Sequence, residues 1–367
     1  MVSDPGTLVN STSTSANYWT QGLSSQQVET GNRIDRLMTL EIRPLSGGLP
    51  PGIVVPMYEV CRAHHEGPLS MAAAAALKEK VVPGSTVFIA TGAGVSPKLP
   101  WGETDGPVGA AALAAALVKG LRAKVVFVTE EAHMAPIKAA VDLMNAKLAV
   151  WAEEKPGRDV QPITIESFPI GMNRGQTRSR ALIETHRPSA VVFVERDGPN
   201  VEGQFHGVRG DCRDPLAVGY VYLLAYHAAE AGIVTIGIGD GGNEVGFGAV
   251  RESIRGVLPL RGRSLAGHES GVVTVVATDV TVSAAVSNWG ACAVGTALAV
   301  LVGDEELLHD ADTEHELIAV TVAAGARDGA TSKQAMIVDG IAFDGHLAFV
   351  NLLSAVARMS IRTAATA

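Results

Sequence analysis

Residues 235–248 read TIGIGDGGNEVGFG, and this stretch sets the pattern from which the fold is inferred. A β-branched, apolar run over residues 234–239 predicts a buried strand that ends in a glycine-rich turn. The turn carries Asp240, Asn243 and Glu244, and we expect a helix to begin there, with backbone N–H groups that attract anions. The dense glycines favour close approach of a ligand to the main chain. An ordinary turn with Asn243 as a helix N-cap is the alternative.

The same alternation of short apolar runs and longer alanine-rich runs extends along the chain. Strands are predicted at residues 86–90, 125–129, 191–195, 234–239 and 272–278. Helices are predicted at residues 26–40, 70–80, 109–120, 132–144, 215–231 and 288–301. Apolar strands that alternate with helices indicate a mostly parallel sheet covered on both faces. We therefore predict an α/β fold, a three-layer αβα Rossmann-like architecture, with ligands beyond the carboxyl ends of the strands.

The chain of 367 residues is predicted to form a single α/β domain over residues 27–367. Residues 1–26 are rich in Ser, Thr, Asn and Gln and predict a flexible N-terminal arm. Pro44 and the segment 47–52 are expected to break the first helix. A boundary near residues 155–157 is possible, but the strand pattern resumes on both sides of it.

Composition limits the class of protein. The formal charge is −9, which speaks against a nucleic-acid partner. Cys61, Cys212 and Cys292 form no CxxC pair and are read as core residues of a protein in a reducing compartment. The arm carries neither a secretory signal nor a transit-peptide pattern, and the apolar runs are of strand length. We expect a soluble, cytoplasmic protein with no membrane partner.

Two glycine-rich patterns resemble the phosphate-binding loop of dinucleotide-binding proteins. Residues 237–242 fit the spelling G-x-G-x-x-G, which leaves a nicotinamide-dependent oxidoreductase as an alternative. Asp240 would place a negative charge in the pyrophosphate site, however, and no acidic residue ends a strand about 20 residues later. Residues 92–97 have proline where the third glycine belongs. No Walker A, HExxH or GxSxG sequence is present, so no nucleotide cofactor is expected.

A second polar cluster, residues 101–110, follows the strand predicted at 86–90. It contains Glu103, Thr104 and Asp105 directly before a helix. The two acids are either helix caps or, together with Asp240 and Glu244, ligands of a shared divalent cation or acid and base groups.

A third cluster spans Glu195 to Asp211. Arg209 suits a substrate carboxylate, or a salt bridge to Asp211 or Glu195. His206 is a candidate for proton transfer near neutral pH, or an ordinary loop histidine. Further along the chain, Ser287 and Asn288 start a helix as caps or ligands, and Asp328 and Asp339 each precede glycine in a turn.

Together these clusters resemble the D-glutamate cyclase-like family. The similarity spans roughly residues 34–353 and rests on residues 103–107, 195–198, 203–210, 238–244 and 287–291 and the Asp-Gly pairs at 328 and 339. Residues 238–244 are its most specific part. Residues 205–208 depart from it, because Phe-His-Gly-Val stands where an aromatic pair followed by Asn-Met is expected.

The resemblance implies reversible cyclisation of D-glutamate to 5-oxo-D-proline, with Mn²⁺ or Mg²⁺. Our hypothesis assigns catalysis to Asp240, Glu244, Glu103 and His206, and a metal to Asp240, Glu244 and Asp105. Substrate binding is assigned to Arg209, Asn243, Gly241, Gly242, Thr104, Asn288 and Ser287, with helix-start N–H groups beside Arg209 at the α-carboxylate. The alternatives are a lyase, lactamase or cyclase acting on another carboxylated amine or lactam, and a non-catalytic amino-acid sensor. A homo-oligomer is possible.

Overall fold

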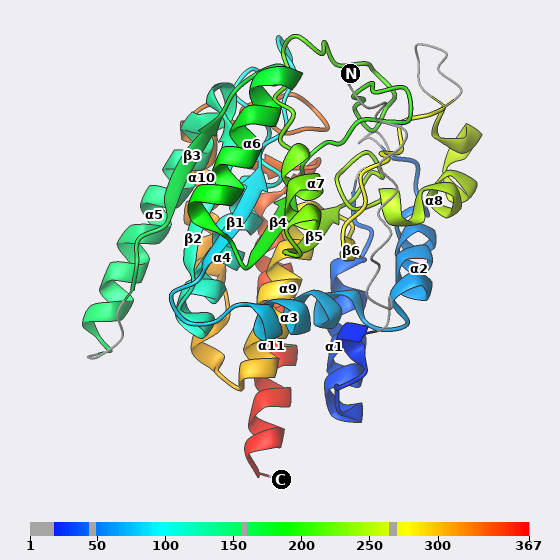
Figure 1. The fold of residues 1–367 in the computed structure, drawn as a ribbon. Helices are drawn as coiled ribbons and strands as arrows, with labels where there is room; N and C mark the ends of the chain where they lie inside the picture. The colour runs from blue at the N-terminus through cyan, green and yellow to red at the C-terminus, as the bar shows by residue number, and fades with distance from the viewer. Residues whose placement is uncertain (1–17, 44–48, 156–159, 264–269, 367) are drawn as a thin grey trace.

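A six-stranded parallel sheet forms the centre of the computed structural model, which describes residues 18–43, 49–155, 160–263 and 270–366 (Figure 1). The strand order is β3-β2-β1-β4-β5-β6. The strands are β1 (Thr86–Thr91), β2 (Lys124–Glu130), β3 (Thr164–Phe168), β4 (Ala190–Val194), β5 (Val234–Gly239) and β6 (Val280–Ser283). A small hairpin, β7 (Ile337–Val338) and β8 (Ile341–Ala342), stands apart from this sheet.

Helices cover both faces of the sheet, as predicted. The α-helices are α1 (Ser25–Met38), α2 (Val54–His65), α3 (Leu69–Lys80), α4 (Pro107–Leu121), α5 (Met134–Glu153), α6 (Met172–His186), α7 (Leu223–Glu230), α8 (Arg251–Val257), α9 (Ser287–Val302), α10 (Ala311–Ala323) and α11 (Phe343–Thr366). Short 3₁₀ turns are η2 (Tyr18–Thr20), η3 (Glu131–His133), η4 (Gly248–Val250), η5 (Pro259–Gly262) and η6 (Glu305–Leu307). No helix in the described ranges combines the length and the apolar character needed to cross a bilayer.

Side chains alternate between two apolar layers because successive strand residues point to opposite faces. Val87 and Ile89 of β1 join the larger core, which includes residues of α1, α3, α4, α9 and α11. Phe88 and Ala90 join a smaller core with residues of α6 and α7. Figure 1 shows α6 and α7 on one face of the sheet and α4 and α9 on the other. The predicted three-layer αβα architecture is confirmed.

The strand predicted at residues 272–278 is wrong. Residues 272–278 are irregular, and the sixth strand is β6, a few residues later. The segment is apolar because its backbone lies under the loops that follow β4 and β5: Thr274 N–H donates to Gly242 O at 3.1 Å and Val275 N–H to Pro199 O at 2.9 Å. Residues 272–278 are therefore apolar because they are buried, and this apolar run resembles that of a strand although the segment does not pair within the sheet.

The helix predicted at residues 215–231 is confirmed only over α7. Residues 215–222 form turns instead, since Gly219 N–H donates to the Glu130 carboxylate at 3.0 Å and holds this stretch against the end of β2. The other predicted helices match α1, α3, α4 and α9, and the helix predicted at residues 132–144 corresponds to α5, which continues to Glu153. α1 ends at Met38, before the break predicted at Pro44 and residues 47–52; residues 44–48 lie outside the described ranges, and residues 49–52 are not helical.

The predicted flexible arm differs from the structure in its last nine residues. Residues 1–17 lie outside the described ranges. Tyr18–Thr20 forms η2, in which Trp19 is buried and Lys80 Nζ lies 5.6 Å from the centre of its ring. α1 then begins at Ser25, with a capping box made by Ser24 and Gln27. The segment after residue 17 is therefore part of the packed domain.

A buried ion pair joins the ends of β2 and β4. Arg196 Nη1 lies 2.6 Å from Glu130 Oε2, and the two side chains are 3% and 4% exposed. Arg196 also donates to Gly92 O and, at 3.1 Å, to Gly219 O. The pair therefore ties three loops together at the edge of the sheet where ligands are expected.

Glu130→Gln is expected to destabilise the protein by roughly 3 kcal/mol at neutral pH, because it leaves Arg196 buried without its counter-charge. Burial alone would raise the pKa of Glu130, but Arg196, together with His133, outweighs it and holds the pKa well below the usual range. This stabilisation is full above the ordinary glutamate pKa and is lost as the pH falls below about 4. In urea unfolding, the difference between wild type and variant should therefore shrink at low pH.

Glu252→Gln is the matched control. Its carboxylate lies 3.1 Å from Arg255 Nη1, but its side chain is 62% exposed, so its loss should cost less than about 1 kcal/mol. Equal effects of the two substitutions at neutral pH would contradict the assigned role of Glu130.

Candidate functional site

A polar pocket lies at the carboxyl ends of β1 and β4, the two neighbouring strands between which the strand order reverses. The strand order places β1 beside β4, so the loops after these strands diverge and leave a crevice. Among the described residues, six carboxylate and four cationic side chains line the pocket: Glu103, Glu195, Asp211, Asp240, Glu244 and Asp339, with Arg43, Lys98, Arg209 and Arg213. Segments far apart in sequence thus supply the charged groups.

The turn after β5 is built around the side chain of Glu244. This carboxylate accepts hydrogen bonds from Gly241 N–H at 2.9 Å and Gly242 N–H at 2.8 Å. The predicted helix start at this turn is wrong, because Glu244 takes these N–H groups and the next helical turns are η4 and α8. Gly241 and Gly242 therefore position Glu244, and their N–H groups already have a partner.

The glycines of β5 serve packing. A Cβ on Gly237 would lie 2.1 Å from Val245 O, and one on Gly239 would lie 2.8 Å from the Phe247 ring. Both glycines stand inside β5, so they let residues 245–247 lie against the strand. This accounts for the G-x-G-x-x-G spelling without a dinucleotide.

Asp105 and Asn288 hold two helix starts together. Asp105 accepts from Ser287 N–H at 2.9 Å and Asn288 N–H at 2.7 Å, at the start of α9. Asn288 Oδ1 accepts from Gly106 N–H and Gly109 N–H, each at 2.8 Å, at the start of α4. Asn288 is fully buried and is not among the pocket-lining residues. The capping alternative therefore describes Asn288, and Asp105 combines a cap with a place near the acids.

Two further predicted substrate residues are engaged inside the protein. Thr104 Oγ1 donates to Ile337 O at 2.9 Å, and Ser287 Oγ donates to Glu195 Oε2 at 2.5 Å. Both side chains are fully buried. Ser287 thus orients Glu195, whereas Thr104 anchors β7.

His206 does not line the pocket. Its ring is fully buried, with Nε2 3.1 Å from Asn200 Nδ2 and Nδ1 3.5 Å from Cys212 Sγ. Its backbone carbonyl accepts from Asn243 Nδ2 at 3.1 Å. His206 therefore lies outside the pocket and contacts Asn243, a pocket residue, through its backbone carbonyl.

In the described part of the chain, two of the cationic residues are paired with aspartates, whereas Arg209 is not. Arg213 lies 2.5 Å from Asp197 Oδ2, and Arg43 pairs with Asp240 and, at 3.2 Å, with Asp339. Arg209 is exposed at the pocket, and in the described ranges it forms no ion pair with Asp211 or Glu195. Arg209 Nη1 donates a long hydrogen bond to Ala330 O, at 3.5 Å.

Sequence reasoning assigned no role in the site to five residues that line the pocket: Arg43, Lys98, Glu195, Arg213 and Asp339. Arg213 stands two residues beyond the third cluster, where Asp211 was the last residue considered. Asp339 belongs to an Asp-Gly pair of the family resemblance, but as an aspartate before glycine it is equally typical of a plain turn. Arg43 precedes a proline and no local pattern distinguishes it, so only the fold brings it to Asp240.

Burial shifts the titration of the acids. It raises the pKa of Glu244 to about 8 and that of Asp105 to about 7, and the charge of Asp240 adds to both shifts. Burial also raises the pKa values of Glu103, Glu195 and Asp339 well above their usual range. Several of these carboxyl groups therefore hold a proton at neutral pH unless a cation neutralises them.

Two groups of carboxylates are close enough to share a cation. Oxygens of Glu195, Asp240 and Glu244 lie within 4.8 Å of one another, and so do oxygens of Asp105, Asp240 and Asp339. In addition, Asn243 Oδ1 is buried with no hydrogen-bond partner among the described residues. Carboxylate and amide oxygens are the ligands that hard divalent cations prefer, so the residues present fit Mn²⁺ or Mg²⁺.

The chain was also compared with known proteins. Residues 54–354 match the family model described as D-glutamate cyclase-like, C-terminal. Human mitochondrial D-glutamate cyclase is 27% identical over 267 residues, which cover 66% of this chain and 40% of the human protein. The chain thus aligns with less than half of that enzyme's length. Since the family model covers most of the sequence, the chain belongs to the D-glutamate cyclase-like, C-terminal, family.

Proposed function

We propose that this chain is an enzyme that reversibly cyclises a small acidic amino acid, D-glutamate in the first instance, to the lactam 5-oxo-D-proline with loss of water. The observation that carries the proposal is the pocket itself, whose wall combines Glu103, Glu195 and Asp240, from the loops after three strands, with the cations Lys98 and Arg209. Family membership and the activity named for the human relative support it.

The reaction needs proton transfer between two atoms of one substrate. As the C–N bond forms, the ammonium group loses two protons, and as the C–O bond breaks, the departing carboxylate oxygen gains them and leaves as water. Glu103 is suited to carry a proton between these atoms, because it lines the pocket and burial raises its pKa well above its usual range. In our proposal Glu103 is the acid and base.

Asp240, Glu195 and Glu244 are proposed to hold a divalent cation. When bound, the cation would neutralise the negative charge of the carboxyl group under attack. The protein's own part is orientation: Ser287 fixes Glu195, the turn N–H groups fix Glu244, and Arg43 fixes Asp240. Each carboxylate therefore has a set direction before substrate enters.

Substrate carboxylate binding is proposed for Arg209, with Lys98 as a second cation of the pocket. Both side chains line the pocket, whereas Arg43 and Arg213 are already paired with aspartates. A guanidinium that is not engaged by a protein carboxylate can accept a substrate carboxylate in bidentate fashion. Arg209 thus sets the preference for acidic substrates.

Arg209→Gln is expected to raise KM by about tenfold or more with a smaller change in kcat, because the lost contact is made in both the ground and transition states. Steady-state kinetics on D-glutamate measure this. Arg174→Gln, at an exposed position of α6, is the matched control and should leave both constants unchanged. A fall in kcat alone would assign Arg209 to the chemical step instead.

The substrate is tested by incubating the protein with a panel of D- and L-acidic amino acids and lactams in the presence of Mn²⁺. Loss or gain of water, followed by mass spectrometry, reports each reaction. Turnover of another carboxylated amine but not of D-glutamate would favour the alternative lyase or lactamase function, to which the departure at residues 205–208 points. Binding without turnover of any compound would favour a sensor. Cytoplasmic location and homo-oligomeric assembly stay predictions.

A further inference from the structure

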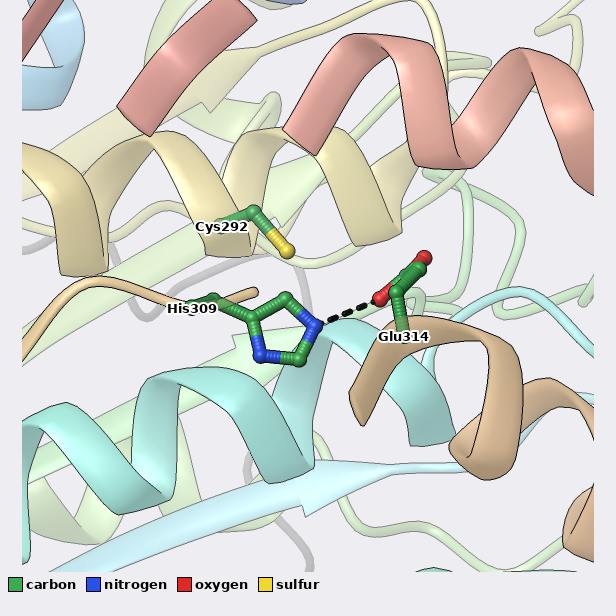
Figure 2. A group of neighbouring side chains, drawn as sticks. All are labelled: Cys292, His309 and Glu314. Carbon is green, nitrogen blue, oxygen red and sulfur yellow. Dashed lines mark hydrogen bonds and ion pairs between the residues drawn. The ribbon is translucent and has the colours of Figure 1, made fainter. Parts of the chain in front are cut away.

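A second group of metal-ligating side chains lies in the helical layer, apart from the acidic pocket. Cys292 is on α9, His309 lies between η6 and α10, and Glu314 is in the first turn of α10. Figure 2 shows the three side chains converging on one point. A ligand atom from each lies within 4.8 Å of the other two, and His309 Nε2 is 2.8 Å from Glu314 Oε2. None of the three lines the acidic pocket.

We propose that Cys292, His309 and Glu314 form a binding site for a zinc-class divalent cation. Thiolate, imidazole and carboxylate are the three ligand types of protein zinc sites. The cation's two positive charges would balance one thiolate and one carboxylate, with the imidazole neutral. This balance matters because Cys292 and Glu314 are 3% and 1% exposed, and buried charges need neutralisation.

The three ligands are held by contacts that need no metal. Asp310 caps α10 by accepting from Thr313 N–H at 2.8 Å and Thr313 Oγ1 at 2.7 Å, which fixes the turn that carries Glu314. Ser354 Oγ of α11 donates to His309 O at 2.9 Å. Cys292 lies within α9, whose start is fixed by Asp105. The ligands therefore sit on rigid elements, as a preorganised site requires.

A cavity lies on the His309 side of the group. It has a volume of about 180 Å³, and His309 forms part of its wall with residues of α4 and α5. Three protein ligands leave one tetrahedral position for water or a small molecule from the cavity, the arrangement of an open zinc site. Lys119, Lys147 and Asp310 also line the cavity, so its wall carries charges of both signs.

The test uses Co²⁺, added to the 367-residue chain after chelator treatment and dialysis. Wild type should bind Co²⁺ and show the ultraviolet charge-transfer band of a cobalt–thiolate bond, and Zn²⁺ should abolish the band by displacement. Cys292→Ala should remove the band. Cys61→Ala, at another buried thiol, and Cys212→Ala, at an exposed thiol near His206, are matched controls that should keep it.

A second variant guards against misfolding of Cys292→Ala, with folding of each protein checked by circular dichroism. His309→Gln retains the thiol and should weaken Co²⁺ binding by about tenfold or more. Absence of the band in wild type, or its persistence in folded Cys292→Ala, would overturn the proposal. Loss of the band in Cys212→Ala would also overturn it, by moving the thiolate ligand elsewhere. Because the readout is spectroscopic, the result is independent of the proposed cyclase activity.

Discussion

Asp240→Asn is expected to abolish turnover, with a loss of at least about 10²-fold in kcat, while the protein stays folded. Asp240 belongs to both clusters of carboxylates that could share a cation, and it also pairs with Arg43. Its negative charge therefore contributes to both candidate cation sites and to the ion pair. Asparagine keeps the size of the side chain but removes its negative charge. Arg43 retains Asp339 as an ion-pair partner at 3.2 Å, which protects the fold.

Asp142→Asn provides the control for this prediction. Asp142 is 59% exposed on α5, where it pairs with Lys138 at 2.5 Å, so the same chemical change should leave activity intact. Turnover is measured with D-glutamate and Mn²⁺, and folding by circular dichroism and thermal unfolding. A folded Asp240→Asn protein with wild-type kcat would remove Asp240 from the proposed chemistry.

Gly237→Ala is expected to destabilise the protein by about 1–3 kcal/mol and to lower activity together with stability. A Cβ at this position would lie 2.1 Å from Val245 O and 2.7 Å from Gly246 Cα, both backbone atoms that cannot rotate away. The turn that carries Asp240 and Glu244 must then shift from β5. Urea unfolding and kcat/KM measure the two effects.

Gly256→Ala makes the same change where there is room. Gly256 lies in α8, and nothing lies within 4 Å of an added Cβ, so alanine should stabilise the helix by up to about 1 kcal/mol. Opposite signs for the two substitutions are expected. Equal stability of Gly237→Ala and wild type would contradict the close packing of the turn on β5.

Much of the fold was predictable because the central strands are buried on both faces. Continuous apolar runs bounded by turns predict β1, β2, β4 and β5 with small errors in their bounds. The edge strand β3 was missed because Thr164, Glu166 and Ser167 give it no apolar run. Some signals were available but not used: Val350, Leu353 and Ala357 of α11 are buried at helical spacing.

The site was predictable where acids directly follow strands. The rule that carboxyl ends of parallel strands share one edge brought Glu103, Asp240 and Glu244 together, and the structure places all three at the pocket. The sequence does not show which way a loop side chain turns, so His206 and Asn288 were expected in the pocket but lie outside it. Arg43 could not be predicted, since its partner Asp240 is 197 positions away.

The most direct test of the account is a proton NMR time course with purified protein, started separately from D-glutamate and from 5-oxo-D-proline, each with Mn²⁺ or with EDTA. The account predicts that both reactions with Mn²⁺ approach the same ratio of the two compounds, and that EDTA stops or greatly slows them. Failure of either compound to convert, while the protein is folded and supplied with Mn²⁺ or Mg²⁺, would contradict it.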